Sequence, residues 1–351
     1  MTSPGERGSW ARRHAGGVSV REVAARAGVS LGTVSNALNR RDLVAPATLA
    51  RVERAMAELG YVLNGSARQL RAGASRVLGV MVLDVGNPFW GEVVRGVEAV
   101  ASEAGYTIMV CSSEESPAKE ERNLRALLEH RVDGLLLAPV ADEEEALREF
   151  RRLDIRVVML DHLSKDPTIA SVAVDDVHGG EIATEHLLAR GHRRIALVNG
   201  DRSIAWCADR RAGAHRAVAA RGLHPEAVVH DVPVTALNAR EGERIGEGLV
   251  AGSPAPTAVL CANDLLALGV LQGVIGRGLR VPDDLAIVGY DDIEFAAAAA
   301  VPLSSVRQPR ELLGRTAAEL LAEEVAGDGT AHEHRHAVFQ PGLIVRRSSE
   351  R

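Results

Sequence analysis

The sequence predicts an α/β protein in two parts: a small three-helix head at the N-terminus and a large body of two doubly wound parallel sheets. Two observations support this prediction. Amphipathic helical patterns without strand-like runs fill the first part of the 351-residue chain. From Arg76 onward, short apolar, β-branched runs alternate with helical stretches, and the second half of the chain repeats the scheme of the first.

Residues 19–39 predict two short helices joined by a tight turn. Ser19 can cap the first helix, and Gly28 supplies the backbone freedom that the turn requires. Ser30 is the expected N-cap of the second helix, and the Val34 side of that helix should be buried. Two helices in this arrangement fit the major groove of DNA, although an ordinary helical hairpin gives the same pattern. The residues of this segment expected to contact DNA are Ser19, Ser30, Leu31, Gly32, Thr33, Ser35, Asn36 and Asn39.

A third amphipathic helix follows, beginning at Pro46 and ending at Gly60. Its apolar residues recur at intervals of three and four, so the three helices can share one small core. The next segment, Tyr61–Leu70, is polar and has too little apolar surface to form a stable helix alone. We expect it to be a linker with a conditional role.

Three segments resemble the LacI/GalR family of bacterial transcription regulators in order and spacing: the turn motif, AMAELGY at 55–61, and N-x-x-A-R-x-L at 64–70. The resemblance continues through almost the whole chain. It implies that residues 64–70 form a hinge helix when two subunits meet on double-stranded operator DNA, with contacts from Asn64, Ala67 and Arg68. It also implies that Leu70 enters the minor groove as an apolar wedge, which kinks the duplex toward the major groove.

The sequence departs from the family pattern at three places. Leu63 stands where members often have proline, and Gly65 lowers the helix propensity of the hinge by about 1 kcal/mol relative to alanine. Asn36 stands where many members have arginine. Leu31 and Gly32 occupy the pair of positions that sets operator specificity in the family, but they do not identify the operator sequence.

Charge divides between the two parts of the chain. Residues 1–75 carry eleven arginines and five acidic residues, a net charge of +6, so the remainder carries −12. A basic head suits contacts with DNA phosphates, and an acidic body opposes non-specific adhesion to DNA. Three scattered cysteines fit a reduced cytoplasm. No segment approaches the roughly 18 consecutive apolar residues of a membrane span, so we expect a cytoplasmic protein without a membrane partner.

Eight apolar runs predict the strands of the two sheets, because continuous apolar runs indicate strands that are buried on both faces. The runs are residues 77–84, 106–113, 133–140 and 157–161 in the first half, and 194–200, 227–234, 257–264 and 285–292 in the second. Polar residues gather at the ends of these runs, where ligands bind in such sheets. They are Asp84, Asp161, Asn263, Asp264 and Asp291.

The resemblance implies a body like that of periplasmic binding proteins, with two lobes and three crossings between them. We expect crossings near Val174, near Gln308 and Pro309, and near His334, because the final run at 339–349 rejoins the second lobe in this family. The expected divisions are a disordered arm (1–16), a DNA-binding domain (17–62), a hinge and linker (63–75), and an effector-binding and dimerisation domain (76–351). Within that domain, lobe 1 comprises about 76–174 and 309–333, and lobe 2 about 175–308 and 334–351.

The resemblance also implies an effector site between the lobes. Arg210, Asn263 and Asp291 match family positions that hold polar groups of the effector, and Asp161 is expected to face the same cleft. A guanidinium fork and carboxylates suit the hydroxyl groups of a sugar. Phe89, Trp90 and Trp206 could supply flat surfaces for a sugar ring. Each residue has a structural alternative: Asn263 and Asp291 as helix caps, Arg210 in an ion pair within one lobe, and the three aromatic residues in the core.

Other classes of protein fit less well. A purine-responsive regulator of the same family is the closest alternative, and a sugar-binding transport protein would need an export signal and no DNA-binding motif. The sequence has no phosphate-binding loop, nucleophile elbow or H-E-x-x-H motif, so we expect no enzyme, no cofactor and no catalytic residues. The His-rich stretch at 332–336 is expected to be a surface loop and not a metal site. No heptad tail follows Ser349, so a homodimer is the default. Whether the effector releases or promotes DNA binding is left open.

Overall fold

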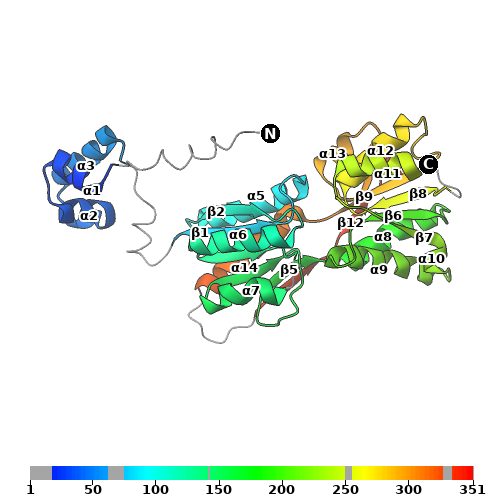
Figure 1. The fold of residues 1–351 in the computed structure, drawn as a ribbon, viewed down its shortest axis with the longest axis horizontal. Coiled ribbons are helices and arrows are strands. Elements are labelled where there is room, and N and C mark those ends of the chain that lie inside the picture. The colour runs from blue at the N-terminus through cyan, green and yellow to red at the C-terminus, as the bar shows by residue number, and fades with distance from the viewer. Residues whose placement is uncertain (1–17, 62–74, 141–142, 250–254, 327–333, 351) are drawn as a thin grey trace, which may run out of the picture. The chain divides into compact units, whose positions relative to one another are not determined.

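The computed structural model describes residues 18–61, 75–140, 143–249, 255–326 and 334–350. The chain divides into two compact units, Met1–Ser75 and Arg76–Arg351 (Figure 1). Among the described residues, no helix has both the length and the apolar character to span a bilayer.

In the described part of the first unit, residues 18–61, three helices surround one small core. They are α1 (Val20–Ala27), α2 (Leu31–Asn39) and α3 (Pro46–Leu59), with a short 3-10 helix, η2 (Arg41–Leu43), before α3. Ser19 caps α1 in a capping box with Glu22, and Gly28 ends α1 in the left-handed region at φ +63°. Val23, Val34 and Val52, one from each helix, are fully buried together. The predicted three-helix head is therefore confirmed.

The second unit contains two parallel sheets, each with helices on both faces (Figure 1). The first sheet has the order β11-β5-β4-β3-β1-β2, and α5 and α14 cover one face while α6 and α7 cover the other. Its elements are β1 (Val77–Val82), β2 (Thr107–Ser112), β3 (Gly134–Leu137), β4 (Arg156–Leu160), β5 (Ser171–Val174), β11 (His336–Phe339), α5 (Pro88–Glu103), α6 (Pro117–Glu129), α7 (Glu143–Arg152) and α14 (Arg310–Ala326).

The second sheet has the order β12-β10-β9-β8-β6-β7, and only β12 is antiparallel to its neighbour. Helices α8 and α9 cover one face, and α11 and α12 cover the other. Its elements are β6 (Ile195–Asn199), β7 (Val229–Pro233), β8 (Ala258–Cys261), β9 (Ala286–Asp291), β10 (Ser304–Arg307), β12 (Gly342–Ile344), α8 (Asp176–Ala189), α9 (Ala205–Ala220), α10 (Pro225–Val228), α11 (Ala239–Leu249), α12 (Asp264–Gly276) and α13 (Glu294–Ala298).

The structure corrects one predicted lobe boundary. β11 pairs in parallel with β5 of the first sheet, with His336 opposite Ser171. The third crossing therefore lies between Phe339 and Gly342, and not near His334. The segment at 336–339 that was expected to be loop and second-lobe chain is a strand of the first lobe, because a short strand at a sheet edge needs no long apolar run.

Three crossings connect the two lobes: from β5 to α8, from β10 to α14, and from β11 to β12. The first two lie at Val174 and at Gln308–Pro309. Parallel strands of both sheets end on the side where these crossings run, so the polar residues at strand ends face the space between the lobes.

Candidate functional site

The exposed side of α2 is formed by fewer residues than the sequence pattern indicated. Leu31 is 47% exposed, and Gly32 and Asn36 are exposed as well. Thr33 and Ser35 are half-buried. Leu31, Gly32 and Asn36, together with Asn39 at the end of the helix, are therefore the exposed residues of α2 available to a DNA partner.

Hydroxyl and amide groups at the ends of α1 and α2 form hydrogen bonds within the head. Ser30 Oγ accepts a hydrogen bond from Thr33 N at 3.1 Å, and Ser19 Oγ accepts one from Glu22 N at 3.3 Å. Asn39 Nδ2 donates to the carbonyl oxygen of Ser35 at 2.8 Å. These groups stabilise the two ends of α2 and the start of α1. Asn64, Ala67, Arg68 and Leu70, as well as Leu63 and Gly65, lie outside the described residues.

Arg51 supports the turn, and the sequence analysis missed it. Its Nη2 donates to the carbonyl oxygens of Ala27 at 2.7 Å and Gly28 at 2.9 Å. These are carbonyls at the C-terminal end of α1, which has no further helical partners for them. An arginine on the polar side of α3 has no sequence signal that distinguishes this role from that of a surface charge.

The seven residues expected to bind an effector all line one narrow cavity of about 30 Å³ between the two lobes, the cleft. Phe89 and Trp90 come from α5, Asp161 follows β4, Trp206 and Arg210 come from α9, Asn263 precedes α12, and Asp291 ends β9. Residues that lie far apart in the sequence are thus brought together by the ends of strands and helices.

Arg210 is the central cation of the cleft and is 5% exposed. Its Nε donates to Asp176 Oδ1 at 2.8 Å, and its Nη1 donates to the carbonyl oxygen of Ala262. The guanidinium carbon lies 3.5 Å from the ring centroid of Tyr290 and 4.4 Å from that of Trp206. Burial lowers the pKa of Arg210, but the Asp176 carboxylate raises it above its ordinary value, so the guanidinium stays charged. Arg210 therefore forms the ion pair within the second lobe that the sequence left as an alternative.

The close approach of α8 to α9 places Asp176 beside Arg210. A methyl group on Gly180 would overlap with the carbonyl oxygen of Arg210, so the two helices can pack this closely only with glycine there. Gly179 leaves room for the Tyr290 hydroxyl, which donates to Asp176 Oδ1 at 2.7 Å. The sequence analysis missed Asp176, because an acidic residue in the first turn of a helix is typical of a helix end.

Asp291 links the second lobe to the first lobe and to a crossing. Its Oδ2 accepts a hydrogen bond from Asn87 Nδ2 at 3.2 Å, and its Oδ1 accepts one from Gln308 Nε2 at 2.8 Å. Asn87 caps α5 in the first lobe, and Gln308 lies between β10 and α14. Burial raises the pKa of Asp291 to about 6, although Arg210 and the two amides lower it. Asn87 and Gln308 are site residues that the sequence analysis did not identify.

Asp161 brings an unsatisfied acceptor to the cleft. Its backbone is in the left-handed region at φ +54°, which is uncommon for a residue with a side chain. Its Oδ1 is buried, and so is Oε1 of Gln308, and neither atom has a hydrogen-bond partner among the described residues. Burial, and then the nearby Asp176 carboxylate, raise the pKa of Asp161 well above its ordinary value. Buried acceptors without donors are rare in proteins, so these two oxygens mark a place for a donor group.

Asn263 and the aromatic residues also have structural roles. Asn263 Oδ1 accepts from Leu266 N at 2.8 Å as the N-cap of α12, and its Nδ2 donates to the carbonyl oxygen of Leu237 at 3.0 Å. Phe89 and Trp90 are buried, with ring centroids 5.0 Å apart in an edge-to-face contact. Trp206 is half-buried. The core therefore takes most of the surface of Phe89 and Trp90, and Trp206 is the aromatic residue most available to a ligand.

The acidic residues at the other strand ends divide into two groups. Asp84 lines the cleft together with Glu115, and burial, assisted by Asp84, raises the pKa of Glu115 to about 7. Asp264 is fully buried and does not line the cleft. Its carboxylate accepts from Ser305 Oγ at 2.7 Å and Ile293 N at 2.8 Å, so Asp264 holds the end of β9 in place.

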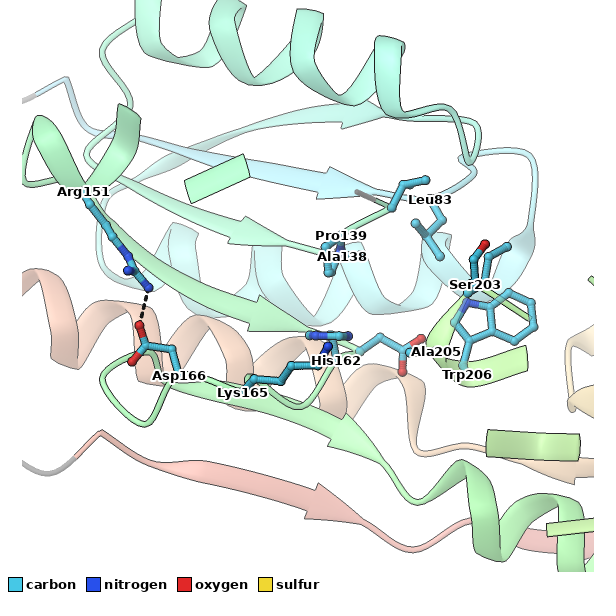
Figure 2. Close-up of a pocket in the computed structure, with 13 residues that line it drawn as sticks. Leu83, Ala138, Pro139, Arg151, His162, Lys165, Asp166, Ser203, Ala205 and Trp206 are labelled. Carbon is cyan, nitrogen blue, oxygen red and sulfur yellow. Dashed lines mark hydrogen bonds and ion pairs between the residues drawn. The ribbon is translucent and has the colours of Figure 1, made fainter. Parts of the chain in front are cut away.

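A larger cavity, the side cavity, adjoins the cleft and has a volume of about 700 Å³. Figure 2 shows Trp206, Ser203 and Ala205 at one end and the Arg151–Asp166 ion pair at the other, with Pro139, His162 and Lys165 between them. Leu83, Asp161 and Trp206 line both cavities. The two cavities therefore lie next to each other between the lobes.

The described part of the His-rich segment takes part in structural contacts. His336 lies in β11, and its Nδ1 is 2.8 Å from Ser171 Oγ, while His334 Nδ1 is 2.9 Å from Glu324 Oε1. Among the described residues, no group of three or more potential ligand side chains could hold a metal ion.

Two family models match this chain. Residues 19–64 match the bacterial regulatory proteins of the lacI family, and residues 184–349 match a periplasmic binding protein-like domain. The HTH-type transcriptional repressor PurR of Photobacterium profundum is 33% identical over 333 residues, which are 94% of this chain and 98% of that protein. The chain belongs to the LacI family. PurR of Vibrio campbellii is 35% identical over 331 residues, 93% of this chain and 97% of that protein.

Solved structures of LacI-family members have the same fold. A lac repressor dimer bound to operator and the anti-inducer ONPF gives a TM-score of 0.78 at 28% identity, covering 95% of this chain and 99% of that one. The regulator CelR in complex with cellobiose gives 0.70 at 32% identity, covering 95% and 100%. A LacI-family regulator from Enterococcus faecium with bound ribose gives 0.71 at 27% identity, covering 78% and 98%.

Membership of the LacI family confirms the predicted fold class and the predicted kind of function. The chain is a DNA-binding transcriptional regulator that responds to a small-molecule effector, and it is not an enzyme. Operator DNA and an effector are its partners.

Proposed function

We propose that this protein is a transcriptional repressor whose affinity for operator DNA is set by a sugar bound between the two lobes of its body. The observation that carries this proposal is a pair of buried acceptors, Asp161 Oδ1 and Gln308 Oε1, that have no hydrogen-bond partner in the described parts of the chain. Asp84 and Glu115 add further carboxylate oxygens to the lining. A sugar offers several hydroxyl donors in a small volume, so it can satisfy acceptors on several sides at once.

The polar balance of the cleft favours a sugar over a purine base. A purine is a flat ring with few donors, and a site for it would need two parallel aromatic or apolar faces. Phe89 and Trp90 are buried in an edge-to-face contact, and Trp206 has Arg210 against its ring. This arrangement offers one exposed aromatic surface, which suits the apolar face of a sugar ring.

Names of similar proteins support both an effector sugar and a second candidate. CelR is described in complex with cellobiose and the Enterococcus faecium regulator with ribose. The repressors named PurR favour a purine, and they match nearly the whole chain at 33–35% identity. A purine-responsive repressor is therefore the second candidate function.

The head is proposed to read the operator through the exposed side of α2. Leu31, Gly32 and Asn36 would meet base edges, and Arg21, Arg26 and Arg40 add positive charge to the same small unit, where phosphates would lie. Ser19, Ser30, Thr33, Ser35 and Asn39 would hold the two helices in register and contact the DNA backbone. The proposal that Asn64, Ala67, Arg68 and Leu70 act in a hinge helix rests on the resemblance alone.

The proposed mechanism is a shift between two arrangements of the lobes. Asp291 contacts Asn87 of the first lobe and Gln308 of a crossing, so a ligand that competes for its carboxylate changes the contacts that hold the lobes together. A homodimer, as in the lac repressor structure, would transmit that change to the spacing of the two heads. The three crossings act as the hinge.

The test begins with selection of duplex fragments by the full chain at stated salt, followed by titration of the selected operator complex with sugars and nucleobases. We expect a near-palindromic operator, with an affinity that at least one sugar changes by tenfold or more. Arg210→Met should abolish that response, and Arg280→Met, on an exposed arginine, should not. A response to hypoxanthine or guanine and to no sugar would contradict the sugar proposal and favour the purine candidate. Operator binding that no compound changes would contradict both.

Asn36→Ala tests the proposed reading of bases by α2. We expect the ratio of affinities for the selected operator and a scrambled duplex to fall about tenfold, while affinity for the scrambled duplex stays the same, because a base contact is worth about 1–3 kcal/mol. An equal loss on both duplexes would contradict base reading by Asn36 and indicate a backbone contact.

A further inference from the structure

The side cavity is many times larger than the cleft, at about 700 Å³ against 30 Å³. Binding pockets for small molecules commonly measure about 300–1,000 Å³. In this arrangement of the lobes, the cleft is too small to enclose a sugar ring, so a unit bound at its polar groups would lie where the cleft meets the side cavity. The side cavity has the volume that a sugar unit needs.

The two cavities join at three residues. Leu83, Asp161 and Trp206 line both of them, so a ligand that contacts Asp161 from the cleft can extend past Trp206 into the side cavity. Asp161 therefore borders both spaces, and its buried Oδ1 has no hydrogen-bond partner among the described residues. A ligand with one unit in each cavity would donate a hydrogen bond to this oxygen from either unit.

The walls of the side cavity are polar but balanced in charge. Arg151 forms an ion pair with Asp166, and Lys165 and His162 lie between that pair and Trp206 (Figure 2), while Asp161 also lines the cavity. Lys165 and His162 take part in other interactions within the protein. Carboxyl side chains thus lie among the cationic side chains of this cavity. The lining is therefore not the cluster of positive charges that a phosphate group requires.

Apolar surface and donor groups alternate around the space. Ala138, Pro139 and Val140 form an apolar strip on the first lobe, and the ring of Trp206 lies on the second. The exposed hydroxyl of Ser203 lies just before α9, which has no side-chain cap at Ile204. The first backbone N–H groups of α9 are therefore available as donors beside the cavity. A neutral sugar ring has apolar faces and hydroxyl groups around its edge. The apolar walls of the cavity can contact those faces, and the polar groups beside them can bind the hydroxyls.

We propose that the effector has two linked units, a neutral disaccharide or a glycoside of similar size, with one unit at the cleft and the other in the side cavity. This inference rests on the proposed sugar effector. It adds that a second subsite, from Pro139 to Trp206, selects ligands by length, and that a free monosaccharide binds more weakly because it leaves this subsite unfilled.

The experiment fills the side cavity with a side chain and leaves the cleft unchanged. Ala205 is exposed, lines the side cavity and opens α9, so Ala205→Trp places a large ring in the second subsite. Ala212→Trp, at an exposed position of the same helix outside both cavities, is the matched control. Unfolding temperatures of both variants without ligand establish that they fold.

The ligands are glucose, galactose and ribose; cellobiose, maltose and lactose; glucose 6-phosphate; and hypoxanthine and guanine. Affinities for the full chain are measured by titration calorimetry. We expect a disaccharide to bind at least tenfold more tightly than any monosaccharide, and Ala205→Trp to weaken that disaccharide at least tenfold while Ala212→Trp changes it less than twofold.

Each other outcome overturns a defined part of the inference. A monosaccharide that binds as tightly as every disaccharide, with no effect of Ala205→Trp, would overturn the second subsite and leave the sugar proposal standing. Tightest binding of glucose 6-phosphate would show that the cavity takes an anion and would overturn the neutral unit. Binding of nucleobases alone, or of no compound, would overturn the sugar proposal and this inference with it.

Discussion

Arg210 Nε lies 2.8 Å from Asp176 Oδ1, and each side chain is only 6% exposed. The same carboxylate oxygen accepts a hydrogen bond from the Tyr290 hydroxyl at 2.7 Å. Arg210, Asp176 and Tyr290 therefore form one buried unit, of which Arg210 lines the cleft. Because a buried guanidinium is costly without a counter-charge, Asp176 fixes the position from which Arg210 can meet an effector.

Removal of Asp176 should destabilise the body strongly. Asp176→Ala leaves Arg210 buried without a carboxylate, and breaking such a pair typically costs about 3–5 kcal/mol. The measurement is urea-induced unfolding of the full chain. Asp284→Ala, which breaks the exposed Arg280–Asp284 pair, should change the free energy of unfolding by less than about 1 kcal/mol. Equal effects of the two substitutions would show that the buried pair contributes no more than a surface pair.

The packing of α8 on α9 gives a second prediction. Gly180→Ala places a methyl group against the carbonyl oxygen of Arg210, so we expect α8 and α9 to separate and stability to fall by about 2 kcal/mol or more. A methyl group on Gly91 of α5 meets no atom within 4 Å, so Gly91→Ala should stabilise by up to about 1 kcal/mol through helix propensity. Thermal unfolding of the two variants compares them. A stabilising Gly180→Ala would contradict the close helix contact.

The turn of the DNA-binding head gives a third prediction. Gly28 and Gly60 both have positive φ, at +63° and +64°, so alanine at either position should cost about 1 kcal/mol. Only at Gly28 would the new methyl group also approach Arg51 Nη2, at 3.3 Å. We therefore expect Gly28→Ala to weaken operator binding more than Gly60→Ala does, measured by fluorescence anisotropy on the selected operator. If Gly60→Ala weakens it equally, the arginine contact does not position α2.

The sequence predicted the head and most of the body, because long periodic patterns and clear caps specify those elements. It missed β5, β10 and β11, which are each four residues long. Two of them begin with polar residues: Ser304 and Ser305 are fully buried in β10, and His336 of β11 contacts Ser171. Hydrogen bonds to neighbouring segments hold these strands in the sheet, as burial of an apolar run holds other strands. A single sequence does not show those hydrogen-bond partners.

From the sequence, the polar residues at the strand ends were expected to gather where ligands bind, since the carboxyl ends of parallel strands meet at one edge of a sheet. The sequence analysis missed the residues that act through long-range contacts. Asn87 and Gln308 reach Asp291 across 204 and 17 residues of sequence, respectively. In the sequence, Asp176 has the pattern of an acidic residue in the first turn of a helix. Such partners become visible only when the crossings place α5, α8 and β9 around the same cavity.

Asp161 gives the last prediction, which links stability to function through pH. Burial and the neighbouring Asp176 raise the pKa of Asp161, whereas in the unfolded chain it ionises near about 3.9. The folded protein therefore holds this proton to higher pH than the unfolded chain does, and its stability falls as pH rises above the unfolded pKa. Asp161→Asn cannot ionise, and asparagine tolerates the left-handed backbone at φ +54°.

We expect Asp161→Asn to unfold at nearly the wild-type temperature at pH 4 and about 2–4 °C above it at pH 8. Glu115, whose pKa is raised to about 7, titrates in both proteins and so cancels in the difference. Asp283→Asn, at an exposed site, should show no such trend. The same Asp161→Asn substitution replaces an acceptor with a donor where an effector hydroxyl would bind, so the operator complex should lose its response to effector. A variant less stable than wild type at pH 8 would contradict the assignment, because it would mean that the Asp161 carboxylate is satisfied within the protein and is not held for a ligand.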